Sequence, residues 1–233
     1  MLDKFYNTNY NIIKDSEKVI LMKKSVYSLV LMDDVIKAVD EQAYLLGTSR
    51  SNLINQILAQ HLSCVTPEMR MREIFDSVTE LISSAFQVQQ QRSASLMTLR
   101  TALDYKYRPT INYKVELERA PDEYLGTLRV MIRTQSAALI RLFDRFFTGW
   151  TAMERKYLTE KGDSCACELS EGSFTRRLIN SGLDPETAGK AISEYLTLLN
   201  RAVQVYFSAP SEFAAALPGI ERQYREMMKA STV

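Results

Sequence analysis

Hydrophobic residues recur along this chain with two different periods. Between residues 33 and 63 they follow helical spacing in two runs, which a Gly-Thr-Ser break at 47–49 separates. Asp33 and Asp34 stand at the start of the first run, where acidic side chains suit the positive end of a helix, and Gly47 suits its end. Ser49 can cap the second run. The pattern predicts two helices joined by a tight turn.

A segment rich in β-branched, aromatic and aliphatic residues precedes these helices at 23–32, and it contains no Gly or Pro. This composition predicts a strand. Because two helices follow it, no neighbouring segment can pair with its backbone groups. The simplest arrangement is an antiparallel ribbon made with the same strand of a second copy, with the helices of both copies beneath it.

The remaining chain predicts a helix-rich α+β domain. A third helix begins near Pro67 and ends before Gln89-Gln90-Gln91. Apolar and polar residues then alternate, which predicts an antiparallel meander over 96–107, 110–117 and 125–134. Further helices are predicted over 138–157, 173–180 and 184–209, with a loop at 161–164 and a last segment bracketed by Pro210 and Pro218. The predicted fold is mainly α with a short β-ribbon, divided into an arm (1–22), a ribbon module (23–66) and an α+β domain (67–233).

Residues 23–63 resemble the ribbon-helix-helix (MetJ/Arc/CopG-like) family of DNA-binding proteins. The resemblance rests on the segments Tyr27-Ser28-Leu29-Val30-Leu31-Met32-Asp33-Asp34-Val35 and Gly47-Thr48-Ser49-Arg50-Ser51-Asn52-Leu53-Ile54. They combine an alternating strand, an acidic helix start, a Gly and a Ser-Arg-Ser opening to the second helix. The match covers under a fifth of the chain.

The resemblance implies a role for each of these residues. The ribbon of the family enters the DNA major groove. Alternation places one side of the strand in the dimer core (Tyr27, Leu29, Leu31) and the other toward the bases (Val26, Ser28, Val30). The phosphate-binding residues are then those entering the ribbon and opening the second helix (Lys23, Lys24, Ser49, Arg50, Ser51). Two valines at base-facing positions depart from the polar residues typical of the family and predict weak hydrogen-bond readout.

Other features of the sequence allow two interpretations each. Cys64, Cys165 and Cys167 with the single His61 lack the spacing of a zinc site, so no metal is expected. Five arginines form either a basic face or ordinary surface charge (Arg129, Arg133, Arg141, Arg145, Arg155). The stripe Phe143-Phe146-Phe147-Trp150 suits a core and, as the alternative, a partner groove or small-molecule pocket. Residues 173–194 fit an αα-hairpin, with a helix-turn-helix as the alternative.

Composition limits the classes of function that are expected for this chain. The 29 basic and 28 acidic residues among 233 give a net charge of +1, so any positive surface must come from local geometry. One histidine and no Gly-rich phosphate loop leave no plausible set of catalytic groups, so neither an enzyme nor a cofactor is expected. The sparse cysteines, the absence of a basic-then-apolar leader and the lack of a long apolar run predict a cytoplasmic, nucleoid-associated protein without membrane contact.

The predicted function is a homodimeric, sequence-selective DNA-binding protein, a prokaryotic transcriptional regulator that acts by occupying an operator in double-stranded DNA. The first alternative is a plasmid or chromosome accessory factor, in relaxosome or segregation complexes, whose C-terminal domain binds a protein partner. An antitoxin is disfavoured, because its toxin-binding part need only be short. A small-molecule partner of the C-terminal domain and assembly beyond the dimer on DNA remain open.

Overall fold

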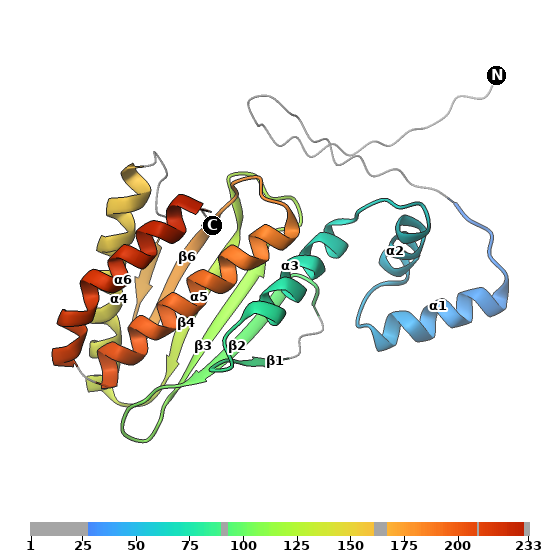
Figure 1. Cartoon of the computed structure of the whole chain (residues 1–233). Helices are drawn as coiled ribbons and strands as arrows, with labels where there is room; N and C mark the ends of the chain where they lie inside the picture. Colours follow the sequence, from blue (N-terminus) through green and yellow to red (C-terminus); the bar gives the residue numbers. More distant parts are fainter. Residues whose placement is uncertain (1–27, 90–92, 161–166, 209, 231–233) are drawn as a thin grey trace. The chain divides into compact units, whose positions relative to one another are not determined.

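The computed structural model describes residues 28–89, 93–160, 167–208 and 210–230 (Figure 1). The chain divides into two compact units, Met1–Cys64 and Val65–Val233.

The N-terminal unit contains the two predicted helices, α1 (Asp33–Leu45) and α2 (Arg50–His61). Gly47 ends α1 as predicted: its φ of 61° lies in the left-handed region, which favours glycine. The N–H of Gly47 donates to the carbonyl of Tyr44 at 3.2 Å, and that of Thr48 donates to Ala43 at 3.0 Å. These are the two hydrogen bonds of a Schellman motif. In the predicted strand, residues 23–27 lie outside the described ranges, and 28–32 are neither helix nor strand within one chain.

A six-stranded antiparallel sheet organises the C-terminal unit, in the order β1-β2-β3-β4-β6-β5. Its strands are β1 (Gln87–Gln89), β2 (Leu96–Ala102), β3 (Thr110–Leu117), β4 (Tyr124–Arg133), β5 (Cys167–Ser170) and β6 (Ser173–Ile179). The predicted meander is confirmed as β2-β3-β4. Strands β1, β5 and β6 were not predicted.

The helix predicted over 173–180 is wrong, because β6 occupies these residues and pairs with β4 on one side and β5 on the other. Phe174, Arg176 and Leu178 are buried, while the residues between them are half-exposed. This is the period of a strand. Because a charged residue, Arg176, occupies one of the buried positions, hydrophobic periodicity alone did not predict this strand. The helix-turn-helix alternative is wrong for the same reason.

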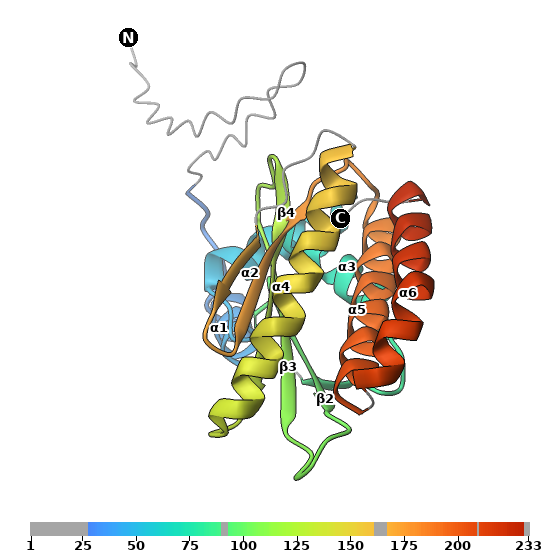
Figure 2. The same cartoon turned by 90° about the vertical axis from the view of Figure 1, so that its left-hand side faces the viewer.

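Four helices lie on one face of this sheet: α3 (Pro67–Leu81), α4 (Ala137–Glu160), α5 (Pro185–Ser208) and α6 (Pro210–Ala230). Figures 1 and 2 show them on the same side, with α6 outermost. The third predicted helix ends at Leu81, earlier than expected, and β1 follows it. The last segment forms one helix that contains Pro218. On the opposite face of the sheet, the described residues of this unit form no helix.

The aromatic stripe of α4 forms part of the core, as predicted, and its four residues are at most 4% exposed. Polar contacts fix α5 on the sheet. Asn200 accepts hydrogen bonds from Thr101 Oγ1 at 3.1 Å and from the Tyr113 hydroxyl at 3.0 Å. Burial raises the pKa of Tyr113, so its hydroxyl stays protonated and can donate. Of the helices in the described ranges, none is both long and apolar enough to cross a membrane.

Candidate functional site

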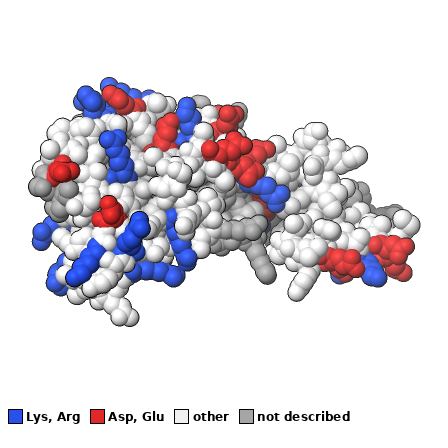
Figure 3. All heavy atoms as spheres, turned by 60° about the horizontal axis from the view of Figure 1, so that its bottom comes forward, with Lys and Arg blue, Asp and Glu red and all other residues white. Residues whose placement is uncertain are grey.

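Large apolar side chains are exposed throughout the described part of the N-terminal unit. Val30 is fully exposed, Tyr44 is 86% exposed, and Leu45 and Leu62 are 72% and 66% exposed. Only three hydrophobic residues among 28–64 are buried: Ala43, Leu53 and Ala59. In Figure 3 the surface of this unit, on the right, is largely uncharged. Exposed apolar surface is typical of interaction sites, which makes this surface a candidate site.

The predicted ribbon residues are only partly covered by the structure. Lys23, Lys24, Val26 and Tyr27 lie outside the described residues. Among the others, Ser28, Leu29 and Val30 are exposed, and Leu31 is half-buried. No strand in the described ranges pairs with residues 28–32, so the predicted alternation between dimer core and groove stays a prediction.

The N-terminus of α2 presents backbone donors to solvent. Ser49 caps the helix, since its Oγ accepts a hydrogen bond from the Asn52 N–H at 3.2 Å and its carbonyl accepts one from Leu53 at 3.0 Å. The N–H groups of Arg50 and Ser51 have no intrahelical acceptor at this position. The first turn contains no acidic residue. The positive end of the helix dipole is therefore open to an anion such as a phosphate.

Arg50 has a partner that the sequence did not indicate. Its Nε and Nη2 donate to the two carboxylate oxygens of Asp40, at 2.5 and 2.6 Å, in a bidentate ion pair between α2 and α1. Both side chains are about half-exposed. Ten residues separate them, and only the turn at Gly47 brings them together. Arg50 can contact a phosphate only if it leaves the Asp40 carboxylate or binds the carboxylate and the phosphate together.

The C-terminal unit contains a buried ion pair. Arg176 Nε of β6 lies 3.2 Å from Glu154 Oε2 of α4, and the side chains are 1% and 0% exposed. Trp150 Nε1 donates to Glu154 Oε1 at 3.1 Å, and the Tyr195 hydroxyl donates to the same oxygen at 2.6 Å. The Arg176 guanidinium also lies over the Tyr195 ring, 4.5 Å from its centroid. The pair therefore ties α4, α5 and the sheet together.

The residues of this cluster shift one another's pKa values. Burial opposes the charge of Arg176, but the Glu154 carboxylate outweighs it and raises the pKa of the guanidinium further above its ordinary value. Burial, and then the charge of Glu154, raise the pKa of Tyr195 and of Tyr224. Both phenols are thus kept neutral, and the Tyr195 hydroxyl donates to Glu154. Sequence reasoning missed this cluster, although the alternation of Phe174, Arg176 and Leu178 was a usable signal.

The described residues weighed as metal ligands belong to different parts of the chain. His61 is the exposed last residue of α2, and Cys64 is exposed beyond it. The Cys167 sulfur, on β5, lies 3.4 Å from Glu154 Oε2. Cys165 lies outside the described residues. Within the described ranges, no three His, Cys, Asp or Glu side chains lie close enough to hold a metal ion.

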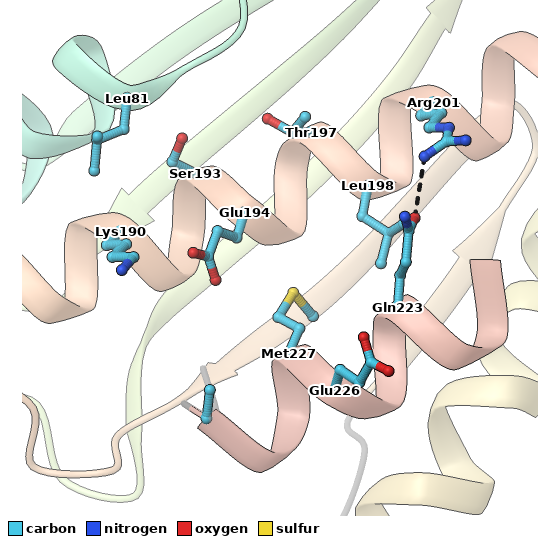
Figure 4. A pocket seen from close by; sticks show the side chains of 11 residues that line it. Leu81, Lys190, Ser193, Glu194, Thr197, Leu198, Arg201, Gln223, Glu226 and Met227 are labelled. Atoms are coloured by element: carbon cyan, nitrogen blue, oxygen red, sulfur yellow. Dashed lines mark hydrogen bonds between the residues drawn. The ribbon is translucent and has the colours of Figure 1, made fainter. Parts of the chain in front are cut away.

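Two hollows border the helices of the C-terminal unit. A groove of about 640 Å³ runs between α5 and α6, with Leu198 and Met227 among its apolar residues (Figure 4). Lys190, Glu194 and Glu226 give it charge, and a 3.2 Å hydrogen bond from Arg201 to Gln223 joins its two helices. A smaller cavity of about 150 Å³ lies between α4 and α6, where Phe146 and Trp150 line it. The aromatic stripe thus forms core and also borders a cavity.

The five arginines considered as a basic face occupy two sides of the C-terminal unit. Arg129 and Arg133 belong to β4, on the face of the sheet opposite the helices. The others belong to exposed positions of α4, on the helical side: Arg141, Arg145 and Arg155. In the view of Figure 3, cationic side chains are interspersed with acidic and uncharged ones. The five therefore do not form one surface.

Comparison with protein-family models finds no match to this chain, and comparisons with curated proteins and with solved structures find none either.

Proposed function

We propose that this protein is a homodimeric, sequence-selective DNA-binding protein of the ribbon-helix-helix type, and a prokaryotic transcriptional regulator that acts by occupying its operator. The observation that carries the proposal is the exposed apolar surface of α1, α2 and the segment before them. A unit that buries so few hydrophobic side chains needs a partner layer. A second copy supplies this layer by symmetry and also supplies the partner strand that residues 23–32 need.

Dimer formation on this surface has a large driving force. Burying one Leu, Ile or Val side chain contributes about 1.5–3 kcal/mol. Tyr44, Leu45, Ile57, Leu58 and Leu62 are all at least 47% exposed in one chain. Burial of even part of this set offsets the cost of association, which is estimated at about 4–15 kcal/mol.

DNA contact in the proposed dimer uses two places in each copy. The open N-terminus of α2, with Ser49, Arg50 and Ser51, binds a phosphate. The ribbon presents Val26, Ser28 and Val30 to the bases, of which only Ser28 can form a hydrogen bond. One dimer then discriminates its site modestly, at about 10³ over other DNA, the low end of the usual range. Adjacent dimers raise the selectivity, and the C-terminal units join them.

A second candidate function is that of a plasmid or chromosome accessory factor whose C-terminal unit binds a protein. The groove between α5 and α6 favours this candidate, because its apolar floor and charged rim suit a helical segment of a partner. Partner capture by the full chain, compared with a chain carrying Leu198→Glu in the groove floor, distinguishes it from a regulator that acts by occupancy alone.

Leu29→Pro in the full chain tests the proposed function. Proline removes one donor of the ribbon ladder and one core side chain, at about 1–3 and 2–5 kcal/mol respectively. We expect a monomer by light scattering and loss of DNA binding by fluorescence anisotropy. Val30→Ala, one position along on the opposite side of the strand, should remain dimeric. A dimeric Leu29→Pro variant that binds DNA like the parent would show that the ribbon assignment is wrong.

A further inference from the structure

In the described part of the C-terminal unit, one face of the sheet carries no helix, and that face is largely polar. In β2, β3, β4 and β6, the buried residues that face the helices alternate mostly with half-exposed or exposed residues on the other side, where Asn112 is the buried polar exception. Antiparallel sheets commonly leave one face to solvent, so exposure alone implies no function. The arrangement of charged residues on this face, in contrast, does indicate a function.

Four cations form a diagonal band across four neighbouring strands. The strand register places Lys114 of β3 directly opposite Arg129 of β4. Arg100 of β2 lies two positions along the ladder from Lys114, because Lys114 pairs with Thr98. Arg177 of β6 lies two positions from Arg129 in the other direction, because Arg129 pairs with Thr175. No acidic residue stands between members of the band.

The centre of the band is electrostatically unfavourable in the isolated unit. Like charges directly opposite one another destabilise a pair of strands. Lys114 has only a long contact of 3.8 Å to Glu116, and both side chains are exposed. Arg129 is exposed and makes no ion pair or hydrogen bond with any other residue in the described ranges. An anionic partner placed over this pair would relieve the repulsion.

The outer members of the band are held in place by the sheet. Arg100 Nε donates to Asn112 Oδ1 on the adjacent strand at 3.0 Å. Arg177 lies over the Tyr124 ring, 4.7 Å from its centroid, and contacts Glu118 at 3.2 Å. Both guanidiniums keep further donors beyond these contacts. The acidic residues of this face are Glu116, which follows Lys114 on the same side of β3, Glu118 beyond the end of β3, and Glu168 on the edge strand β5.

We propose that this basic sheet face is a second DNA-binding surface, which contacts the phosphate backbone beside the site bound by the N-terminal unit. The inference rests on the proposed function and extends it. Strands lie about 4.8 Å apart and rise about 3.3 Å per residue, so the band is about 20 Å long. That length matches about six base-pair steps of duplex DNA. It is sufficient for several consecutive phosphates.

The other side chains of this face support phosphate contact over protein contact. Thr98, Thr127 and Thr175 are half-exposed hydroxyl donors on the same side of the sheet. Arginine, lysine and small polar donors are the residues that contact DNA phosphates. A protein interface would instead show aromatic residues and an apolar centre. The apolar residues of this face include Leu96, Met131 and Tyr124, which are half-buried, and Tyr124 lies at the start of β4 under Arg177, away from the centre of the face.

The test is the salt dependence of duplex binding by the full chain with Lys114→Gln and Arg129→Gln together. The matched control is Arg141→Gln with Arg145→Gln, which removes the same charge from the exposed side of α4. DNA of mixed sequence serves as the probe, in anisotropy titrations over a salt series. We expect the sheet variant to lower the log–log salt slope by about two per chain engaged, and the α4 variant to leave it unchanged. The thermal midpoint of the sheet variant should equal or exceed that of the parent.

The outcomes of this experiment distinguish failure of the proposed function from failure of the proposed sheet surface. A parent chain that binds no duplex would overturn the proposed function and this inference together. A parent chain that binds DNA, with equal slopes in both variants, would overturn the sheet surface alone. If poly-glutamate binds the parent, and only the sheet variant loses that binding while keeping the parental DNA slope, the surface takes an acidic protein and the DNA assignment is wrong.

Discussion

The two units of this protein place their hydrophobic residues differently. In the C-terminal unit, Leu99, Tyr113 and Leu128 of three neighbouring strands are completely buried beneath the helices. In the N-terminal unit, Tyr44 and Leu62 are mostly exposed although they belong to well-formed helices. The C-terminal unit closes a core within one chain. In its described residues, the N-terminal unit has helices without a second layer, and the proposed function assigns that layer to a second copy.

The same contrast appears in the ion pairs. Arg50 and Asp40 of the N-terminal unit form a bidentate pair in solvent. Arg176 and Glu154 of the C-terminal unit form a pair from which water is excluded. An exposed pair contributes little and can exchange partners, whereas a buried one is costly to break. Arg50 can therefore exchange Asp40 for another anion, whereas Arg176 stabilises the fold.

The largest effect is expected from Arg176→Met in the full chain. Removing the guanidinium leaves the Glu154 carboxylate buried without its cation, which costs about 3–5 kcal/mol. Thermal unfolding followed by near-UV circular dichroism measures the loss. Arg177→Met is the matched control, because Arg177 is partly exposed and pairs with Glu118 in solvent.

Adding Glu154→Gln to Arg176→Met should recover most of this loss, since a neutral amide oxygen can still accept from Trp150 and Tyr195. The mass of the proposed dimer should not change in either variant, because the proposal assigns dimer formation to the N-terminal unit. Equal destabilisation by Arg176→Met and Arg177→Met would contradict the structural role of the buried pair.

A smaller effect is expected where two helices of the C-terminal unit approach closely. A Cβ at Gly189 of α5 would lie 2.4 Å from Ser77 Cβ and 2.6 Å from the Ile74 carbonyl oxygen of α3. Gly189→Ala should therefore destabilise the unit by about 1–3 kcal/mol in urea unfolding, because one helix must shift. Gly149→Ala meets nothing within 4 Å and should stabilise α4 by about 0.5–1 kcal/mol. If both substitutions stabilise the unit, the α3–α5 contact accommodates the added methyl group without cost.

The smallest effect on stability is expected at the exposed pair of the N-terminal unit. Arg50→Ala and Asp40→Asn should each change the free energy of unfolding by about 0.2–1 kcal/mol. Their effects on DNA binding should be opposite. Arg50→Ala should weaken binding to all sequences and lower the salt slope by about one per contact, or two per dimer. Asp40→Asn should tighten binding, because it frees Arg50. An unchanged slope in Arg50→Ala would exclude Arg50 from the interface.

Local features of the fold were predictable because their physical causes are local. The turn at Gly47 needs a left-handed residue and a helix on either side, and all three are visible in a short window of sequence. The alternation in 110–117 and 125–134 identifies strands because one face of the sheet is buried. The cap at Ser49 follows from its position before α2. The site residues predicted on α2 are located at an open helix N-terminus for the same reason.

The sequence by itself determined the helices of the N-terminal unit and the meander, because period and caps act over a few residues. Only the tertiary structure decided that Arg176 is a core residue, since its burial depends on Glu154 twenty-two positions away on another element. It also decided that Arg50 meets Asp40, and that Arg100, Lys114, Arg129 and Arg177 share one face in a diagonal band. These arrangements follow from helix packing and strand register, which long-range contacts set and no local pattern encodes.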